Sequence, residues 1–391
     1  MENNIFKVFL NKGEEKRLLE GHPWVFNNEV KSFEGKIISG EICEVYSFDN
    51  RYVGKGFFNS SSKIMVRLLT RKNEEINEDF FRKRIIDAWK YRKDLGLDNN
   101  CRLIFSEADF IPGLIVDKYG DYLSIQVLSL GIEKRKQMFI KLLVEILHPL
   151  GIYERSDVSV RLKEGLDEYK GIVYGDFNPL VQIEENGIKM YVDIENGQKT
   201  GYFLDQKYNR RALQDYVKDK CVLDCFAHTG GFSLHASKYG AKNIDAVDIS
   251  EKAVEDIQAN ALLNSFNNIK AICYDVFDYL RLEDCKNKYD VIILDPPAFT
   301  KSKDTVEKAY RGYKDINLQA LKIIKSGGIL FTFSCSQHMT PALFLEMIKE
   351  ASVDSKRNVQ MIDFRIQAMD HPTLVGSDES FYLKCVVLHI I

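Results

Sequence analysis

The stretch VLDCFAHTGGFSLHA (222–236) decides the fold of the C-terminal half of the chain. It begins with a compact apolar run, turns at two adjacent glycines and continues as a helix-like segment. Four further apolar runs, each followed by a helix-like segment, are NIDAVDI (243–249), IKAICYD (269–275), YDVIILD (289–295) and GGILFTFS (327–334). This alternation of strands with helices such as EKAVEDIQANALLN predicts an α/β fold with a doubly wound parallel sheet.

Aspartates end four of these five strands, at Asp224, Asp248, Asp275 and Asp295. Ligands of a doubly wound sheet bind at the carboxyl ends of its strands. The glycine pair lacks the G-x-G-x-x-G spacing of a pyrophosphate loop, which disfavours a dinucleotide. Asp248, 24 positions after Asp224, suits the ribose hydroxyls of a nucleoside cofactor, and Asp275 suits an adenine amino group. Because aspartate also favours helix N-caps, each residue alone has a structural alternative, but four together favour a cofactor site.

The front of the chain is organised differently. Short β-type stretches, EICEVYSF, RYVGKGFF and KIMVRLLT, occupy residues 5–70, and apolar periodicity predicts one amphipathic helix over 77–95. Strands are predicted at CRLIFSEA and at DYLSIQVLS, the latter preceded by a turn at 117–120, then a helix over 133–150 and two more strands. The last strand pairs through a hairpin at Asn186-Gly187. We therefore predict three domains, a β-rich domain over 1–72, an α+β domain over 73–185 and the doubly wound domain over 186–391.

Composition excludes several classes of protein. With 391 residues, 45% hydrophobic and 28% charged, the chain is neither collagen-like nor largely disordered. A net charge of -3 means that any RNA contact comes from a local patch, and it permits a homodimer without requiring one. The N-terminus is charged where a signal peptide is apolar, and no run approaches the roughly 18 apolar residues of a membrane span. Eight cysteines without a C-x-x-C pair argue against a zinc site. We expect a cytoplasmic protein with no metal.

Several separated motifs resemble one enzyme family. VLDCFAHTGGFSLHA, AVDIS, DPPAF and FSCS together resemble class I S-adenosylmethionine-dependent methyltransferases. More narrowly, the chain resembles the ribosomal RNA large-subunit methyltransferase I family, which makes 5-methylcytosine in 23S rRNA. The likeness extends to ENGQKTGYFLDQ (195–206), RGYKDINLQAL (311–321) and HPTLVGSDESFYLK (371–384), and GHPWVFNNEV (21–30) resembles the start of that family's PUA domain.

The resemblance implies S-adenosyl-L-methionine as the cofactor, large-subunit ribosomal RNA as the partner, and a PUA-like RNA-binding domain over residues 1–72. It places Asp295 beside the methionine end of the cofactor and the target base. The cofactor-binding residues it implies, with Asp248 on the ribose and Asp275 near the adenine, are Phe203, Gln206, Asp224, Thr229, Gly230, Asp248, Asp275 and Asp295.

Cys335, at the end of the fifth strand, is the predicted nucleophile. Carbon C5 of cytosine is a poor nucleophile, but a thiolate added to C6 makes C5 enamine-like, so that C5 takes the methyl group. A base then removes the C5 proton and the thiol leaves; the sequence does not identify that base, since DPPAF has no second cysteine. An acid near N3 or N4 stabilises the adduct, which suits Asp295.

The alternative is that Cys335 is a small apolar filler. Four other cysteines lie within strand patterns and are assigned that filler role, namely Cys221, Cys225, Cys273 and Cys385. Cys335 differs because serines flank it and because it ends its strand. The nearby His228 and His338 are interpreted as structural, since no second ligand pair accompanies them.

Residues 63–93 form a candidate RNA-binding segment. Ten basic residues (63, 67, 71, 72, 82, 83, 84, 90, 92 and 93) stand there against five acidic ones, with Trp89 and Tyr91 interleaved. Such a mixture binds phosphate and stacks on bases, although a solvated helix face with a buried aromatic stripe explains it equally well.

Two other functions remain open on the sequence. A methyltransferase acting on a base nitrogen would need no thiol, and would stay active without Cys335. A non-catalytic RNA-binding assembly factor would keep the fold and lose the cofactor.

Overall fold

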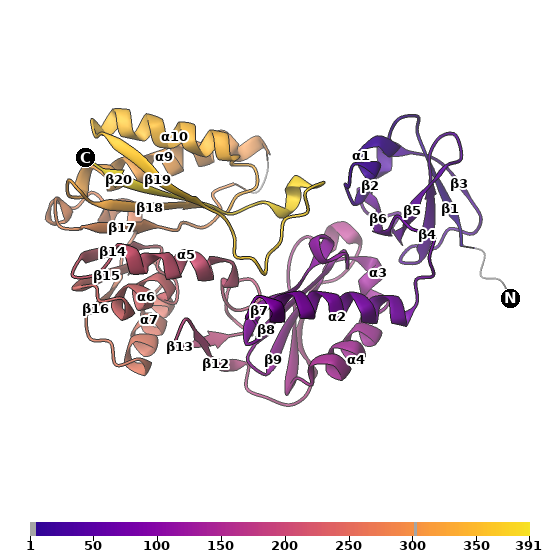
Figure 1. Cartoon of the computed structure of the whole chain (residues 1–391), viewed down its shortest axis with the longest axis horizontal. Coiled ribbons are helices and arrows are strands. Elements are labelled where there is room, and N and C mark those ends of the chain that lie inside the picture. The colour runs from indigo at the N-terminus through magenta and orange to yellow at the C-terminus, as the bar shows by residue number, and fades with distance from the viewer. Residues whose placement is uncertain (1–4, 301–302) are drawn as a thin grey trace. The chain divides into compact units, whose positions relative to one another are not determined.

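The computed structural model describes residues 5–300 and 303–391, and the chain divides into two compact units (Figure 1). Unit 1 comprises Met1–Ile183, Val192–Asp205 and Met369–Ser380. Unit 2 comprises Glu184–Tyr191, Gln206–Ala368 and Phe381–Ile391. Two segments that lie among unit 2 elements in the sequence therefore belong to unit 1.

A six-stranded sheet forms the first part of unit 1. Its strand order is β2-β6-β5-β4-β1-β3, and the predicted strands at 41–48, 51–58 and 63–70 are confirmed as β4, β5 and β6. Val8, Val45 and Val66 are among the buried residues of its core. The elements are β1 (Lys7–Leu10), α1 (Glu15–Leu19), β2 (Trp24–Phe26), β3 (Val30–Glu34), β4 (Ile42–Tyr46), β5 (Tyr52–Phe58) and β6 (Ile64–Thr70).

A five-stranded sheet of order β11-β10-β9-β8-β7 forms the rest of unit 1. Helix α2 (Glu78–Asp94) begins at an Asn77 N-cap and buries Phe81 and Ile85, as its periodicity predicts. The turn predicted at 117–120 is wrong for its first three residues, which belong to strand β8. The elements are α2, β7 (Asn100–Phe105), β8 (Leu114–Tyr119), β9 (Tyr122–Val127), α3 (Leu130–Glu133), α4 (Lys136–Leu147), β10 (Gly151–Ser156) and β11 (Tyr169–Tyr174).

Polar side chains between these strands explain that error. Asp117 lies opposite Arg102 in the antiparallel β7–β8 pair and is fully buried. Arg102 donates to both of its carboxylate oxygens, each at 2.8 Å. The sequence Asp-Lys-Tyr-Gly is typical of a turn, but it also occurs where a buried aspartate is paired inside a strand. Only the partner on the neighbouring strand distinguishes the two cases.

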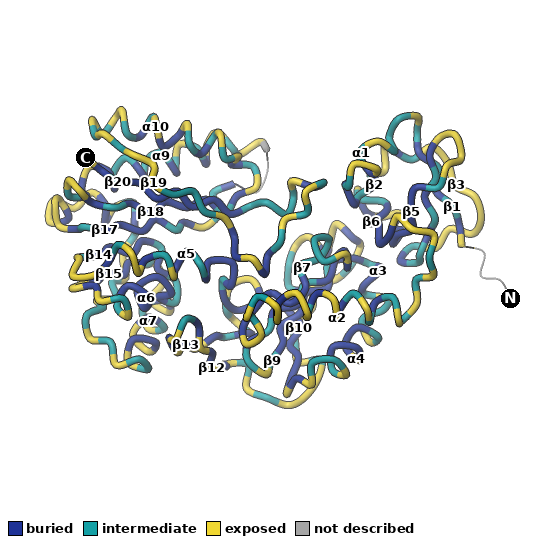
Figure 2. The backbone as a smooth tube through the Cα atoms, in the orientation of Figure 1, coloured by how far each residue is buried: buried dark blue, intermediate teal, exposed yellow. Residues whose placement is uncertain are grey.

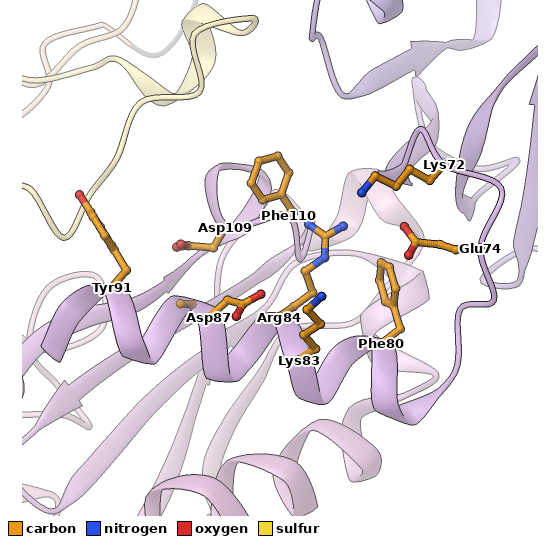
Figure 3. A pocket seen from close by; sticks show the side chains of 10 residues that line it. Lys72, Glu74, Phe80, Lys83, Arg84, Asp87, Tyr91, Asp109 and Phe110 are labelled. Atoms are coloured by element: carbon orange, nitrogen blue, oxygen red, sulfur yellow. The ribbon is translucent and has the colours of Figure 1, made fainter. Parts of the chain in front are cut away.

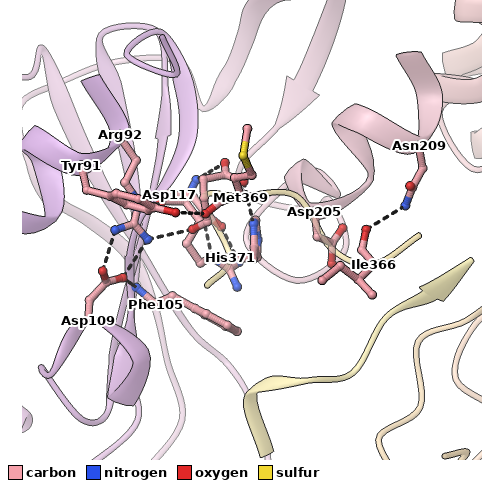
Figure 4. Close-up of polar contacts among 12 residues, drawn as sticks. Tyr91, Arg92, Phe105, Asp109, Asp117, Asp205, Asn209, Ile366, Met369 and His371 are labelled. Carbon is pink, nitrogen blue, oxygen red and sulfur yellow. Dashed lines mark hydrogen bonds and ion pairs between the residues drawn. The ribbon is translucent and has the colours of Figure 1, made fainter. Parts of the chain in front are cut away.

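The segment Met369–Ser380 is held to unit 1 by a second arginine. Arg92, on α2, donates to both carboxylate oxygens of Asp109 (2.5 and 2.7 Å) and to the backbone carbonyl of Asp370 (2.8 Å). The Tyr91 hydroxyl donates to the carbonyl of Met369 (3.0 Å) (Figure 4). These contacts pack a distant part of the sequence against α2.

A hairpin of strands β12 (Leu180–Glu185) and β13 (Ile188–Asp193) leads toward unit 2. Its turn residues Asn186 and Gly187 both have positive φ, 52° and 73°, which suits a two-residue hairpin turn. The predicted Asn-Gly hairpin is confirmed.

Unit 2 is built on a seven-stranded sheet of order β16-β15-β14-β17-β18-β20-β19. The five predicted strands are parallel and confirmed, and β20 and β19 add an antiparallel edge. The elements are α5 (Lys207–Arg211), β14 (Cys221–Cys225), α6 (Gly231–Lys238), β15 (Asn243–Asp248), α7 (Glu251–Leu263), β16 (Ile269–Cys273), α8 (Val276–Tyr279), β17 (Val291–Leu294), α9 (Val306–Ile323), β18 (Ile329–Ser334), α10 (Pro341–Ser355), β19 (Val359–Arg365) and β20 (Lys384–Ile390).

Helices cover both faces of this sheet, so its strands are buried on both sides (Figure 2). On one face, Tyr313 of α9 and Phe344 of α10 pack with Leu223 and Leu330. On the other face, α6 packs against Val222, Ile293, Phe331 and Phe333. Within the described residues no helix is both long and apolar enough to cross a membrane.

Candidate active site

The strand order reverses between β14 and β17, and their carboxyl ends frame the candidate site. Strands β15 and β16 extend from β14 on one side, whereas β17 and β18 extend on the other. Ligands of open α/β sheets bind at such a switch point. Successive strand residues point to opposite faces, and Asp224, Asp295 and Cys335 have the parity of the residues that pack toward α6. Three of the predicted residues therefore share one face at one edge.

The turn after β14 is held in an unusual conformation. Phe226, His228 and Gly230 all have positive φ, 62°, 51° and 85°. A bulky residue such as Phe226 rarely adopts this region, and such strain gathers at functional sites. A Cβ at Gly230 would lie 3.1 Å from the Ile257 side chain, so glycine also permits close packing of the turn on α7.

Hydrogen bonds hold the same turn in place. Asn260 Nδ2 donates to the carbonyl of Thr229 (3.1 Å), and the backbone N–H of His228 donates to the Asp248 carboxylate (2.9 Å). These bonds tie the turn that contains Thr229 and Gly230 to α7 and to Asp248. His228 contributes its backbone to them.

Asp224 is a buried carboxylate with one oxygen in use. Oδ2 accepts from the backbone N–H (3.0 Å) and hydroxyl (2.6 Å) of Ser233. Oδ1 is buried and has no hydrogen-bond partner among the described residues. Burial raises the pKa of Asp224 to about 7. An ammonium group of a ligand would satisfy both the free oxygen and the uncompensated charge.

Asp275 caps a helix, whereas Asp248 does not. Ser250, not Asp248, caps α7, because the Ser250 hydroxyl accepts from the Ala253 N–H. Asp275 does cap α8, its Oδ1 accepting from the N–H groups of Phe277 (2.7 Å) and Asp278 (3.3 Å). Both aspartates are half-buried.

Gln206 and Asp295 are brought together although 89 positions separate them. Gln206 Nε2 lies 3.0 Å from each carboxylate oxygen of Asp295, and Gln206 Oε1 accepts from Asn209 Nδ2 (2.7 Å). Gln206 is buried and Asp295 half-buried. Asn209 carries no signal in the sequence that marks it as a site residue. Phe203 belongs to unit 1, where Lys199 Nζ lies 4.5 Å from its ring centroid.

Cys335 lies against the DPPAF segment. Its Sγ is 3.9 Å from the carbonyl oxygen of Pro296, and the side chain is half-buried. By contrast, Cys225 and Cys385 are fully buried in the core, and burial raises the pKa of each thiol well above its ordinary value. The expected filler role of Cys273 is wrong, because this residue is exposed at the sheet edge.

Two further residues stand beside this edge. Lys384 is buried, and its Nζ donates to the carbonyls of Ser336 (2.5 Å) and Tyr382 (2.7 Å). Burial lowers the pKa of Lys384 to about 8 and raises that of Tyr313 to about 12. Both residues fall within the stretches 311–321 and 371–384, but only the fold shows where they lie. In the described part of the chain no cluster of three metal-ligating side chains occurs.

Two parts of the chain match models of known protein families. Residues 8–71 match the model of a PUA-like domain, and residues 170–379 match that of an S-adenosylmethionine-dependent methyltransferase. These matches confirm the predicted fold class and cofactor.

Close relatives and solved structures extend the likeness to nearly the whole chain. It is 43% identical to ribosomal RNA large subunit methyltransferase I of Vibrio vulnificus and 44% identical to that of Vibrio cholerae, in each case over 97% of this chain and 99% of the relative. A crystallised candidate S-adenosylmethionine-dependent methyltransferase from Streptococcus mutans superposes with a TM-score of 0.83 at 23% identity, over 98% of this chain and 99% of the other. A related structure described as a complex with S-adenosylhomocysteine has a TM-score of 0.84 at 23% identity, over the same shares.

Proposed function

The chain belongs to the family of ribosomal RNA large subunit methyltransferase I, and from this premise we propose that it methylates C5 of a cytosine in 23S rRNA through a covalent adduct with Cys335. The observation that carries the proposal is the position of Cys335, half-buried and 3.9 Å from the Pro296 carbonyl beside Asp295. A thiol at the rim of a methyl-donor site suits attack on C6 of the base.

The residues present fit the cofactor. The unpartnered buried Oδ1 of Asp224 suits the amino group of its methionine end, and the half-buried carboxylate of Asp248 suits its ribose hydroxyls. Thr229 and Gly230 shape the turn between them, and Asp275 is the residue proposed toward the adenine. When bound, S-adenosyl-L-methionine supplies an electrophilic methyl group.

The reaction steps in which the protein takes part begin at the Sγ atom of Cys335. The Cys335 thiolate forms a bond to C6 of cytosine, and the electron pair of the C5–C6 double bond becomes available at C5. C5 forms a bond to the methyl group as the bond between that group and the sulfonium sulfur breaks, which leaves S-adenosylhomocysteine. A base then takes the C5 proton, and the electron pair of the C5–H bond restores the double bond as the C6–S bond breaks. The thiolate is regenerated, so atoms and charge balance over the cycle.

Asp295 is proposed to act on the ring of the target base. Gln206 Nε2 donates to both of its oxygens, which orients the carboxyl group. In its protonated form this carboxyl group donates its proton to N3, which neutralises the negative charge that develops there when sulfur adds to C6. Gln206, held by Asn209, is the positioning residue.

The test is mass spectrometry of nucleosides from large-subunit ribosomal RNA incubated with the protein and isotope-labelled S-adenosylmethionine. Wild type is expected to produce labelled 5-methylcytosine, and Cys335→Ala none. Cys273→Ala, which removes an exposed thiol at the sheet edge, is the matched control and should retain activity.

A labelled purine, or label that survives Cys335→Ala, would contradict the thiolate mechanism and favour methylation of a base nitrogen. Absence of label together with absence of cofactor binding in calorimetry would favour a non-catalytic RNA-binding factor.

A further inference from the structure

Five of the ten cations in residues 63–93 pair with a carboxylate or donate to two backbone carbonyls. Arg67 pairs with Glu107 and Glu164, each at 2.9 Å, and Arg92 is buried against Asp109. The others so engaged are Arg71 with backbone carbonyls, Arg82 with Glu78 and Glu145, and Lys90 with Asp94. Fewer cations are therefore available to bind RNA than the count of basic residues in the sequence indicates.

Three of the remaining cations line one pocket of unit 1. Lys72, Lys83 and Arg84 border a pocket of about 420 Å³ (Figure 3). None of the three has an ion pair among the described residues. The pocket's Asp109 is already neutralised by Arg92, so the local balance is positive despite Glu74 and Asp87 nearby.

Arg84 is the most unusual of these cations. Its guanidinium lies between two rings, with its central carbon 4.8 Å from the Phe80 centroid and 5.0 Å from that of Phe110. Its hydrogen bond within the described chain runs from Nη2 to the Leu69 carbonyl (3.3 Å). Burial lowers the pKa of Arg84 below its ordinary value. A partly desolvated guanidinium with spare donors and no carboxylate is suited to a phosphate.

Phe110 supplies the second independent feature. It is 44% exposed at the pocket and has φ 59° and ψ 28°, a left-handed conformation that costs a bulky residue energy. Tyr91, which also lines the pocket (Figure 3), is 40% exposed. Exposed rings beside unpaired cations are the combination with which proteins bind unpaired bases of single-stranded nucleic acid.

We propose that this pocket binds one unpaired nucleotide of the RNA substrate, with its base stacked on Phe110 and its phosphate beside Arg84. The proposal rests on RNA being the substrate, but not on which base is methylated or on Cys335. Lys72 and Lys83 hold the flanking backbone, and the Asp87 carboxylate accepts from an exocyclic amino group of the base. A duplex, whose bases are stacked and paired, does not enter.

The experiment measures RNA binding by fluorescence polarisation with the full-length chain. The probes are a labelled single-stranded RNA of mixed sequence, about 12 nucleotides long, and the same RNA as a duplex. Phe110→Gly is expected to weaken single-strand binding about tenfold and leave duplex binding unchanged. Arg84→Met is expected to weaken it about tenfold and to make binding less steeply salt-dependent, by roughly one phosphate contact.

Two controls separate the pocket from general effects. His148→Gly makes the same backbone change at another exposed left-handed residue of unit 1, φ 48°, and Lys90→Met removes an exposed cation from the same helix. Neither should change binding of the single strand. Because glycine relieves a left-handed residue, Phe110→Gly should not lower the melting temperature, which excludes misfolding as the cause of lost binding.

Wild-type affinity in both Phe110→Gly and Arg84→Met would overturn the proposal. Equal weakening of single-strand and duplex binding would also overturn it, because that result identifies a backbone-binding patch and not a nucleotide pocket. Either result leaves the Cys335 mechanism standing, since methyl transfer is measured separately.

Discussion

Asp117 in unit 1 and Asp224 in unit 2 are both buried carboxylates in strands, with at most 1% of their surface exposed, yet their surroundings are opposite. Asp117 has a bidentate arginine, Arg102, across the strand pair, and a hydroxyl donor in Thr200. Asp224 has only Ser233, leaves one oxygen without a partner in the described chain, and has its pKa raised to about 7.

This difference in partners distinguishes a buried carboxylate that stabilises the fold from one that is suited to bind a ligand. A buried carboxylate without a cation is costly, so a protein retains one where a ligand completes it. In unit 1 Arg102 neutralises Asp117 across the β7–β8 pair. Unit 2 leaves its charge incomplete at the carboxyl end of β14, where the cofactor of this family of enzymes is expected to bind.

Breaking the complete pair should have the largest effect. Arg102→Met leaves Asp117 buried without its cation, and we expect a loss of about 3–5 kcal/mol in the free energy of unfolding of unit 1. Chemical denaturation measures it. Arg281→Met, which breaks an exposed pair in which Nη2 of Arg281 donates to both oxygens of Asp315, should cost about 1 kcal/mol or less. A similar loss for the two variants would remove the distinction between the units.

Removing the unpaired carboxylate of Asp224 should weaken ligand binding without lowering the stability of the unliganded protein. Asp224→Asn is expected to lower the affinity for S-adenosylhomocysteine about 100-fold, measured by calorimetry. The melting temperature of the unliganded protein should stay the same or rise, because a desolvated charge is gone. Asp290→Asn, at the opposite edge of the sheet, is the control and should bind normally. Unchanged affinity in Asp224→Asn would show that the carboxylate does not hold the ligand.

The pH dependence sharpens the same comparison. The ligand ammonium needs the ionised form of Asp224, whose pKa is about 7, so affinity for S-adenosylhomocysteine should rise about fivefold between about pH 6 and about pH 7, about twofold more by about pH 8, and then level off. Because the folded-state pKa is raised, this group stabilises the unliganded fold at low pH, and that stability is lost as pH rises from about 4 to about 7.

In Asp224→Asn both profiles should lose this component. A wild-type affinity that does not vary over this range would place the pKa of Asp224 elsewhere and weaken the assignment.

The smallest effect tests Asp275, which is both a helix cap and a predicted adenine contact. Asp275→Ser keeps a cap for α8, whereas Asp275→Ala loses it at a cost of about 1 kcal/mol in unfolding free energy. If the carboxylate also contacts adenine, both variants should weaken S-adenosylhomocysteine binding by a few-fold. Loss of stability in Asp275→Ala with normal binding in both would leave the cap as its whole role.

Helices and strands with a clear apolar periodicity could be predicted from the sequence. Strands that depend on pairing with distant segments could not. Helix α2 and the five parallel strands follow from local apolar patterns. Strand β8 was partly mistaken for a turn, since Asp117 reads as a turn residue until Arg102 faces it. The antiparallel edge formed by β19 and β20 was missed as well, because pairing with β18 is a long-range contact that no local pattern contains.

The sequence by itself determined the doubly wound sheet, the acids at its strand ends and Cys335 as a candidate, because each depends on residue type and short-range spacing. The cofactor came from the resemblance of its motifs to a known family. Only the tertiary structure decided which charges are complete. It joined Gln206 to Asp295, left Asp224 half-satisfied, committed Arg67 and Arg92 to internal pairs and left Arg84 between two rings. Whether a charge is satisfied depends on what folding brings within a few ångströms of it, and residues far apart in the sequence supply those partners.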